Sequence, residues 1–165
     1  PSTQRTTSHA VELLATMMEQ AALMQQIEPP MPPLLLAVDD EIISRRALVA
    51  ALDLACLRVV SLEDPFLAQR VATENSFDLI FLDVEMPEKT GFELCAEIRQ
   101  LPTNQSTPVV FVTGLNGFEA RARSAMSGGS DLIAKPFLPI ELAVKAITYL
   151  TTSHLKPVTR GTWGT

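Results

Sequence analysis

The stretch Phe77-Asp78-Leu79-Ile80-Phe81-Leu82-Asp83-Val84-Glu85-Met86-Pro87 decides the fold. Its apolar run, residues 79–82, has the length of a strand that is buried on both faces, as in a parallel sheet. Asp83 follows where this run stops, and Pro87 and Gly91 then predict a loop before the next helix. In open parallel α/β sheets, ligands bind just outside the carboxyl ends of the strands. We therefore expect Asp83 at a strand tip, at the mouth of a crevice.

The same alternation of strand and helix continues on both sides of this stretch. It predicts strands over residues 34–38, 57–62, 77–82, 108–112 and 132–134, and helices over 42–55, 65–75, 91–101, 118–126 and 139–150. Five alternating pairs are typical of a doubly wound parallel sheet, for which the flavodoxin-like order 2-1-3-4-5 is the natural choice. On the helix over 42–55, we expect the inner face to consist of Ile43, Ala47, Ala50, Ala51 and Leu54.

Three segments divide the chain. Residues 1–33 hold a predicted extra N-terminal helix, His9–Ile27, and a connector stiffened by four prolines within residues 29–33. This helix packs on its own domain, pairs with a partner or a second copy, or ends a preceding domain; the sequence leaves these alternatives open. Residues 34–150 form the main domain and 151–165 a flexible polar tail. Because the chain begins with Pro1 and not Met, we expect a piece of a longer protein.

Composition narrows the class of protein. The 165 residues are 47% hydrophobic, enough for a real core, and carry a net charge of −6. Lys and Arg form no cluster, so nucleic-acid binding by this chain is not expected. The apolar runs are far shorter than the ~20 residues of a membrane helix, so neither a signal peptide nor membrane insertion is predicted. Cys56 and Cys95 are interpreted as buried free thiols, which suits a reducing cytosol and a cytoplasmic location.

Polar side chains follow four of the predicted strands. They are Asp39 and Asp40 after the first, Asp83 after the third, Thr113 after the fourth and Lys135 after the fifth. Three carboxylates at one edge repel one another unless a cation compensates, and an all-oxygen site of this kind suits Mg²⁺. A carboxylate left free to attack is a nucleophile for phosphorus. Mg²⁺, Lys135 and the Thr113 hydroxyl would then stabilise the phosphoryl oxygens.

Several short motifs in this order resemble the receiver domain of two-component response regulators. They are Val38-Asp39-Asp40-Glu41, Asp83 with Met86-Pro87 and Gly91, Val112-Thr113-Gly114, and Lys135-Pro136-Phe137. The resemblance covers roughly residues 34–150. It implies that Asp83 is the phosphoacceptor, that Thr113 follows the phosphoryl group and that Lys135 pairs with it. The Lys135–Pro136 peptide bond is often cis in this family.

The resemblance also implies the metal ligands. Asp40, Asp83 and the backbone carbonyl of Glu85 would bind Mg²⁺ directly, and Asp39 would act through water. The sequence departs from the family at Leu132, where many members carry a Tyr or Phe that rotates on activation.

The expected function is a phosphorylation-controlled signalling module of a bacterial phosphorelay, and not a turnover enzyme. The resemblance implies a histidine kinase or phosphotransfer protein as donor, and an output face made by residues 118–150. A homodimer through the N-terminal helix or through that face is a further expectation.

Two alternative functions stay open. One is a receiver-like interaction scaffold that works without phosphorylation. The other is a haloacid-dehalogenase-type phosphatase, which Glu85 disfavours because those enzymes carry an Asp two residues after the nucleophile.

Overall fold

The computed structural model describes residues 31–115 and 118–154. The helix predicted over residues 9–27 and the tail from residue 155 lie outside the described residues. The chain divides into two units, Pro1–Met31 and Pro32–Thr165, and every described helix and strand belongs to the second.

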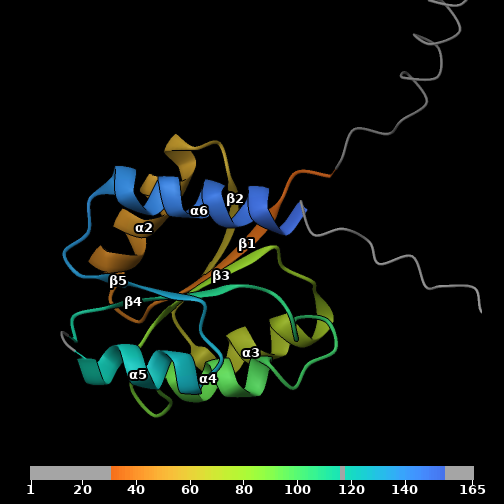
Figure 1. Cartoon of the computed structure of the whole chain (residues 1–165), viewed down its shortest axis with the longest axis vertical. Coiled ribbons are helices and arrows are strands. Elements are labelled where there is room, and N and C mark those ends of the chain that lie inside the picture. The colour runs from red at the N-terminus through yellow and green to blue at the C-terminus, as the bar shows by residue number, and fades with distance from the viewer. Residues whose placement is uncertain (1–30, 116–117, 155–165) are drawn as a thin grey trace, which may run out of the picture. The chain divides into compact units, whose positions relative to one another are not determined.

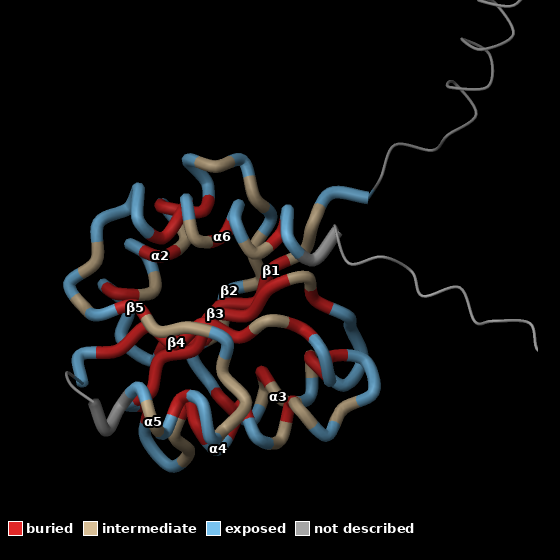
Figure 2. The backbone as a smooth tube through the Cα atoms, viewed as in Figure 1, coloured by how far each residue is buried: buried red, intermediate tan, exposed pale blue. Residues whose placement is uncertain are grey.

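Five parallel strands form the centre of this unit. They are β1 (Leu34–Val38), β2 (Arg58–Leu62), β3 (Leu79–Asp83), β4 (Val109–Thr113) and β5 (Asp131–Ala134). Their order is β2-β1-β3-β4-β5, which confirms the predicted doubly wound topology. Strands β3 and β4 are buried at every residue, whereas the edge strand β2 is partly exposed. Figure 2 shows this buried centre between the two layers of helices.

Helices cover both faces of the sheet. They are α2 (Ile42–Leu54), α3 (Pro65–Glu74), α4 (Gly91–Ile98), α5 (Phe118–Met126) and α6 (Pro139–His154). Figure 1 shows α2 and α6 on one face and α3, α4 and α5 on the other. Each layer has its own apolar cluster, because alternate residues of a strand point to opposite faces. Leu36 and Phe111 belong to the α3–α5 side, and Leu35 and Val110 to the α2–α6 side.

Local sequence explains where two of the helices begin. Asp64 accepts a hydrogen bond from the Phe66 amide, and Pro65 opens α3. At α4, the Thr90 hydroxyl accepts from the Glu93 amide while the Glu93 carboxylate accepts from the Thr90 amide, a complete capping box. Helix α2 has no side-chain cap of this kind.

The predicted inner face of α2 is wrong for most of its residues. Ile43 and Leu54 are 74% and 76% exposed, and of the predicted set only Ala51 is buried. The buried face consists instead of Ser44, Leu48, Ala51 and Leu52. The physical reason is that α2 has a second apolar stripe, which packs into the apolar cluster of the α2–α6 layer on the side where Ser44 donates a hydrogen bond to Asp39.

Two smaller expectations also fail. Cys95 is buried as predicted, but Cys56 is exposed. It follows the end of α2 in a left-handed turn with φ of 56°, outside the apolar context assumed for it. Helix α6 continues to His154, four residues beyond its predicted end, so the residues 151–154 assigned to the flexible tail are helical.

Candidate functional site

Three carboxylates meet at the carboxyl edge of the sheet. Asp39 and Asp40 follow β1, and Asp83 ends the neighbouring strand β3. One oxygen from each lies within 4.8 Å of the other two. Asp39 and Asp83 are buried, whereas Asp40 is exposed at the rim. The switch point of the sheet thus brings these three acids together, as the sequence predicts.

Lys135 lies between two of these acids. It follows β5, and its Nζ lies 2.8 Å from Asp39 Oδ2 and 3.1 Å from Asp83 Oδ2. Burial works to lower the pKa of Lys135, but the hydrogen bonds to both carboxylates outweigh it and raise that pKa. Burial raises the pKa of Asp83, although the hydrogen bond and charge of Lys135 act against it. The ammonium group therefore stays charged and offsets part of the repulsion among the acids.

The carboxylate of Asp39 is already bound on both oxygens. Oδ1 accepts the Glu41 amide at 2.9 Å, and Oδ2 accepts the Ser44 hydroxyl at 2.5 Å as well as Lys135. Arg45 Nη1 donates to the Asp39 backbone carbonyl at 2.6 Å. Sequence reasoning missed Ser44 and Arg45. A signal was present for Ser44, which is a polar residue in the first turn of the helix that leaves the acidic strand end.

The two oxygens of Asp83 differ. Oδ1 accepts the Val84 amide at 2.7 Å and lies 3.4 Å from the Glu85 amide. Oδ2 faces Lys135. The backbone here is tightly packed, because a Cβ on Gly91 would lie 2.0 Å from the Asp83 carbonyl oxygen. Gly91 thus allows the start of α4 to approach β3, and Oδ2 is the oxygen that points toward the rest of the site.

Thr113 and Glu85 border the cluster. Thr113 ends β4 and is fully buried; its hydroxyl accepts the Leu115 amide at 3.1 Å. Its backbone carbonyl accepts the Lys135 amide at 2.8 Å, which ties the two predicted site residues together through the main chain. Glu85 is exposed, and its carboxylate lies on the Gly114 side of the mouth. The bond between Lys135 and the following proline is cis.

The donor set fits a hard divalent cation. Carboxylate oxygens are the ligands that Mg²⁺ prefers, and it usually keeps several waters. Asp40 is exposed at the rim, and Asp83 presents Oδ2 toward the cluster. Asp39, whose oxygens are already hydrogen-bonded, suits a contact through water. The part of the chain that the structure describes contains no other group of three His, Cys, Asp or Glu side chains arranged in this way.

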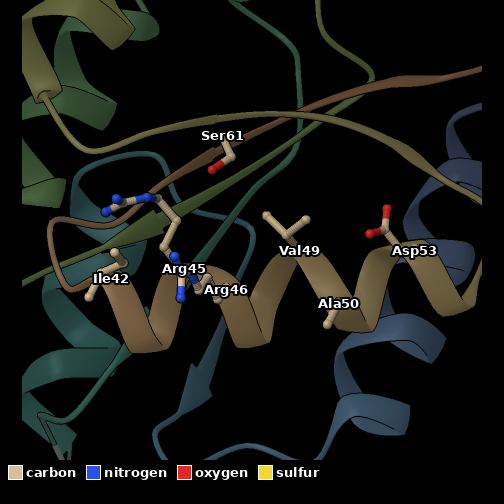
Figure 3. Close-up of a pocket in the computed structure, with 7 residues that line it drawn as sticks. All are labelled: Ile42, Arg45, Arg46, Val49, Ala50, Asp53 and Ser61. Carbon is tan, nitrogen blue, oxygen red and sulfur yellow. The ribbon is translucent and has the colours of Figure 1, made fainter.

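A hollow lies on another side of α2. It measures about 470 Å³ and is lined by Arg45, Arg46, Asp53 and Ser61, among others. Figure 3 shows Val49 and Asp53 on the side of the helix that faces Ser61. None of the three clustered acids lines it, and Arg45 is held by Asp39 and Glu63. This hollow is therefore separate from the carboxylate site.

Similarity to known proteins agrees with this geometry. Residues 35–147 match the response regulator receiver domain model. The chain is 36% identical over 102 residues to the response regulator PleD of Caulobacter vibrioides, covering 62% of this chain and 22% of PleD. It is 35% identical over 115 residues to the transcriptional regulatory protein ResD of Bacillus subtilis, covering 68% of this chain and 47% of ResD. The chain thus spans less than half the length of these curated relatives.

Solved structures show the same fold. The chemotaxis protein CheY4 of Vibrio cholerae superposes with a TM-score of 0.67 at 30% identity, over 72% of this chain and 98% of CheY4. A response regulator from Chloroflexus aurantiacus superposes with a TM-score of 0.68 at 29% identity, over 73% of this chain and 98% of that one. The family match spans well over half of the residues and includes the whole sheet except Leu34, the first residue of β1. The chain belongs to the receiver domain family of two-component response regulators.

Proposed function

We propose that Asp83 accepts a phosphoryl group from a histidine kinase or a histidine phosphotransfer protein, in a Mg²⁺-dependent reaction. One observation carries this proposal. Lys135 bridges Asp39 and Asp83 within a cluster of three carboxylates at the switch point of the sheet. Response regulators interact with histidine kinases or phosphotransfer proteins, so a phosphohistidine is the donor that fits this family.

The chain's own residues divide the work of phosphoryl transfer. One carboxylate oxygen of Asp83 forms the new O–P bond while the N–P bond of the donor breaks, and the histidine nitrogen leaves with its electron pair. The Lys135 ammonium group pairs with the Asp83 carboxylate before transfer and with the phosphoryl oxygens after it, and the Thr113 hydroxyl donates a hydrogen bond to one of these oxygens. Asp40, Asp83 and the Glu85 carbonyl would hold a Mg²⁺ ion directly and Asp39 would hold it through water, and the ion would supply further charge neutralisation.

The signal would leave through α5, β5 and α6. In our proposal this face contacts the next component of the signalling pathway. A homodimer would form either through the same face or through the N-terminal helix. The protein acts as a cytoplasmic signalling domain and not as a turnover enzyme, and this chain does not itself bind nucleic acid. Among the described residues no helix is long and apolar enough to cross a membrane.

Leu132 supports a second candidate function. It stands where many receiver domains carry the rotating aromatic residue, and it is half-buried against the apolar cluster of the α3–α5 layer. A residue without a ring to swing inward offers no obvious readout of a phosphoryl group at Asp83. A phosphorylation-independent interaction scaffold is therefore the alternative.

Intact mass spectrometry separates the two functions. The chain is incubated with acetyl phosphate with and without Mg²⁺, as the wild type, Asp83→Asn and Asp53→Asn. We expect one added phosphoryl group in the wild type and in Asp53→Asn, which removes an exposed carboxylate outside the cluster. The addition should disappear in Asp83→Asn and without Mg²⁺. An unmodified wild type that is folded and still binds Mg²⁺ would instead support the scaffold.

A further inference from the structure

An apolar groove lies between the end of α2 and the first half of α6. We call it the α2–α6 groove and define it by Leu54, Leu138, Ile140, Val144 and Ile147, which line a hollow of about 420 Å³. These five side chains are between 47% and 76% exposed. Large apolar side chains that gather on one surface usually mark a binding site. The α2–α6 groove is therefore a candidate binding site.

The other sides of α6 already have partners. Leu142 and Ala146 are buried in the apolar cluster under the α2–α6 layer. Lys145 forms an ion pair with Asp131 of β5, and the Tyr149 hydroxyl donates to the Ser130 carbonyl. These contacts hold α6 against the sheet without help from the groove residues. Folding of the described unit therefore does not account for the apolar character of the groove.

We propose that residues 155–165 fold back along α6 and place Trp163 in the α2–α6 groove. Trp163 is the only tryptophan of the chain and the largest apolar side chain in this segment. Burying an indole ring removes a large apolar area from water, and indole rings are common anchors in binding pockets.

The length of the segment permits this contact. The described part of α6 ends at His154, seven residues after Ile147. At 1.5 Å per residue, these two positions are about 10 Å apart along the helix. The nine residues from 155 to 163 reach up to about 30 Å when extended. Pro157 favours an end to the helix soon after His154, and the chain can then reverse.

Charge favours the same occupant. Residues 155–165 carry Lys156 and Arg160 and no acidic residue. Glu141 is exposed on α6, one turn before Val144 and on the same side of the helix. Glu141 would repel an acidic segment at the groove, whereas it attracts the basic residues 155–165. The groove also extends to Leu138, three residues after Lys135, so the docked tail would compete with any partner that approaches that side of the site.

Fluorescence of the single tryptophan tests this proposal directly. The full chain is compared with Ile140→Asp, Val144→Gln and Met126→Asp. Ile140 lies in the first turn of α6, where an acidic residue suits the helix, so this variant should fold. We expect wild-type emission at shorter wavelength, with several-fold weaker acrylamide quenching, than N-acetyltryptophanamide. Both groove variants should shift the emission and the quenching to the free value. Met126 is 87% exposed on α5, in the other layer, and its substitution should change neither.

Tryptic cleavage after Arg160 gives a second readout, and it should be several-fold faster in the groove variants than in the wild type. Wild-type emission equal to that of the free compound would overturn the proposal, as would a shifted emission that the groove variants leave unchanged. Emission that moves to longer wavelength on dilution, together with a dimer in analytical ultracentrifugation, would assign the groove to a second copy and would also overturn it.

Discussion

The two helical layers of this receiver domain differ in how they use apolar side chains. In α4 the apolar residues Phe92, Leu94, Cys95 and Ile98 are all buried against the sheet. In α2 and α6, apolar residues are buried on one side of each helix, while others such as Ile43 and Ile140 are exposed on another. In the α3–α5 layer, Phe66 and Met126 are exposed on two separate helices, whereas α2 and α6 present several exposed apolar side chains that line one groove.

This difference explains why the predicted inner face of α2 is wrong. An amphipathic pattern identifies the core-facing side when a helix has one apolar stripe. Helix α2 has two, and tertiary packing decides which of them faces the sheet. Leu48, Ala51 and Leu52 enter the apolar cluster of the α2–α6 layer, and Ser44 donates a hydrogen bond to Asp39. That contact joins residues brought together by folding of the site, so no periodicity shows it.

The largest expected effect lies in the α3–α5 layer. Phe111 is fully buried and packs edge-on against Phe92, with ring centroids 4.9 Å apart. Phe111→Ala should lower the free energy of unfolding by about 3–5 kcal/mol, through lost burial and the cavity left behind. Urea denaturation measures this change. Met126→Ala, on an exposed side chain of the same layer, should stay within about 0.5 kcal/mol. A small loss at Phe111 would mean that this layer is not the tightly packed one.

The next largest effect distinguishes the buried stripe of α2 from its exposed stripe. Leu48 is 1% exposed and Ile43 is 74% exposed. Leu48→Ala should cost about 2–5 kcal/mol, and Ile43→Ala no more than about 0.5 kcal/mol, in the same denaturation experiment. Equal losses would show that the outer stripe is also buried in solution. The pair therefore tests whether the two stripes of α2 have separate roles.

Much of the fold and of the site followed from the sequence, for a physical reason. Buried parallel strands are continuous apolar runs, and their carboxyl ends meet at one edge. Asp39, Asp83 and Lys135 were therefore predicted to converge, and the structure brings them together. The contacts of Ser44 and the exposure of Cys56 did not follow. They depend on how a helix rotates and on where it ends, and these are set by tertiary contacts.

A smaller effect concerns the close packing where α4 meets β3. A Cβ on Gly91 would lie 2.0 Å from the Asp83 carbonyl oxygen, which belongs to the backbone and cannot move aside. Gly91→Ala should cost about 1–3 kcal/mol, and it should slow labelling of the chain by acetyl phosphate. On Gly114, the new Cβ would meet only the Glu85 side chain, at 3.3 Å. Gly114→Ala should therefore leave the free energy of unfolding nearly unchanged. If Gly91→Ala changed the free energy of unfolding as little as Gly114→Ala, the close approach of α4 to β3 would not contribute to stability.

The smallest expected effect concerns the N-terminal capping of α4 compared with that of α2. Helix α4 has a capping box of its own, whereas α2 has none. Hydrogen bonds from the Thr90 amide and hydroxyl lower the pKa of Glu93. A carboxylate with a lowered pKa in the folded state stabilises the protein above its unfolded pKa, about 4.3 for glutamate. This contribution is lost as the pH falls through the folded pKa.

Glu93→Gln keeps a hydrogen-bonding side chain but removes the charge. We therefore expect the wild type to be the more stable of the two at pH 7, with a difference that shrinks as the pH falls below about 4.3. Urea denaturation at a series of pH values measures it, with Glu74→Gln as the control for an exposed charge in the same layer. Thr90→Ala, which removes the hydroxyl half of the box, should cost about 1 kcal/mol at pH 7. A pH-independent difference for Glu93→Gln would mean that α4, like α2, begins where tertiary contacts place it. The contrast between a self-capped helix and a helix positioned by the site would then fail.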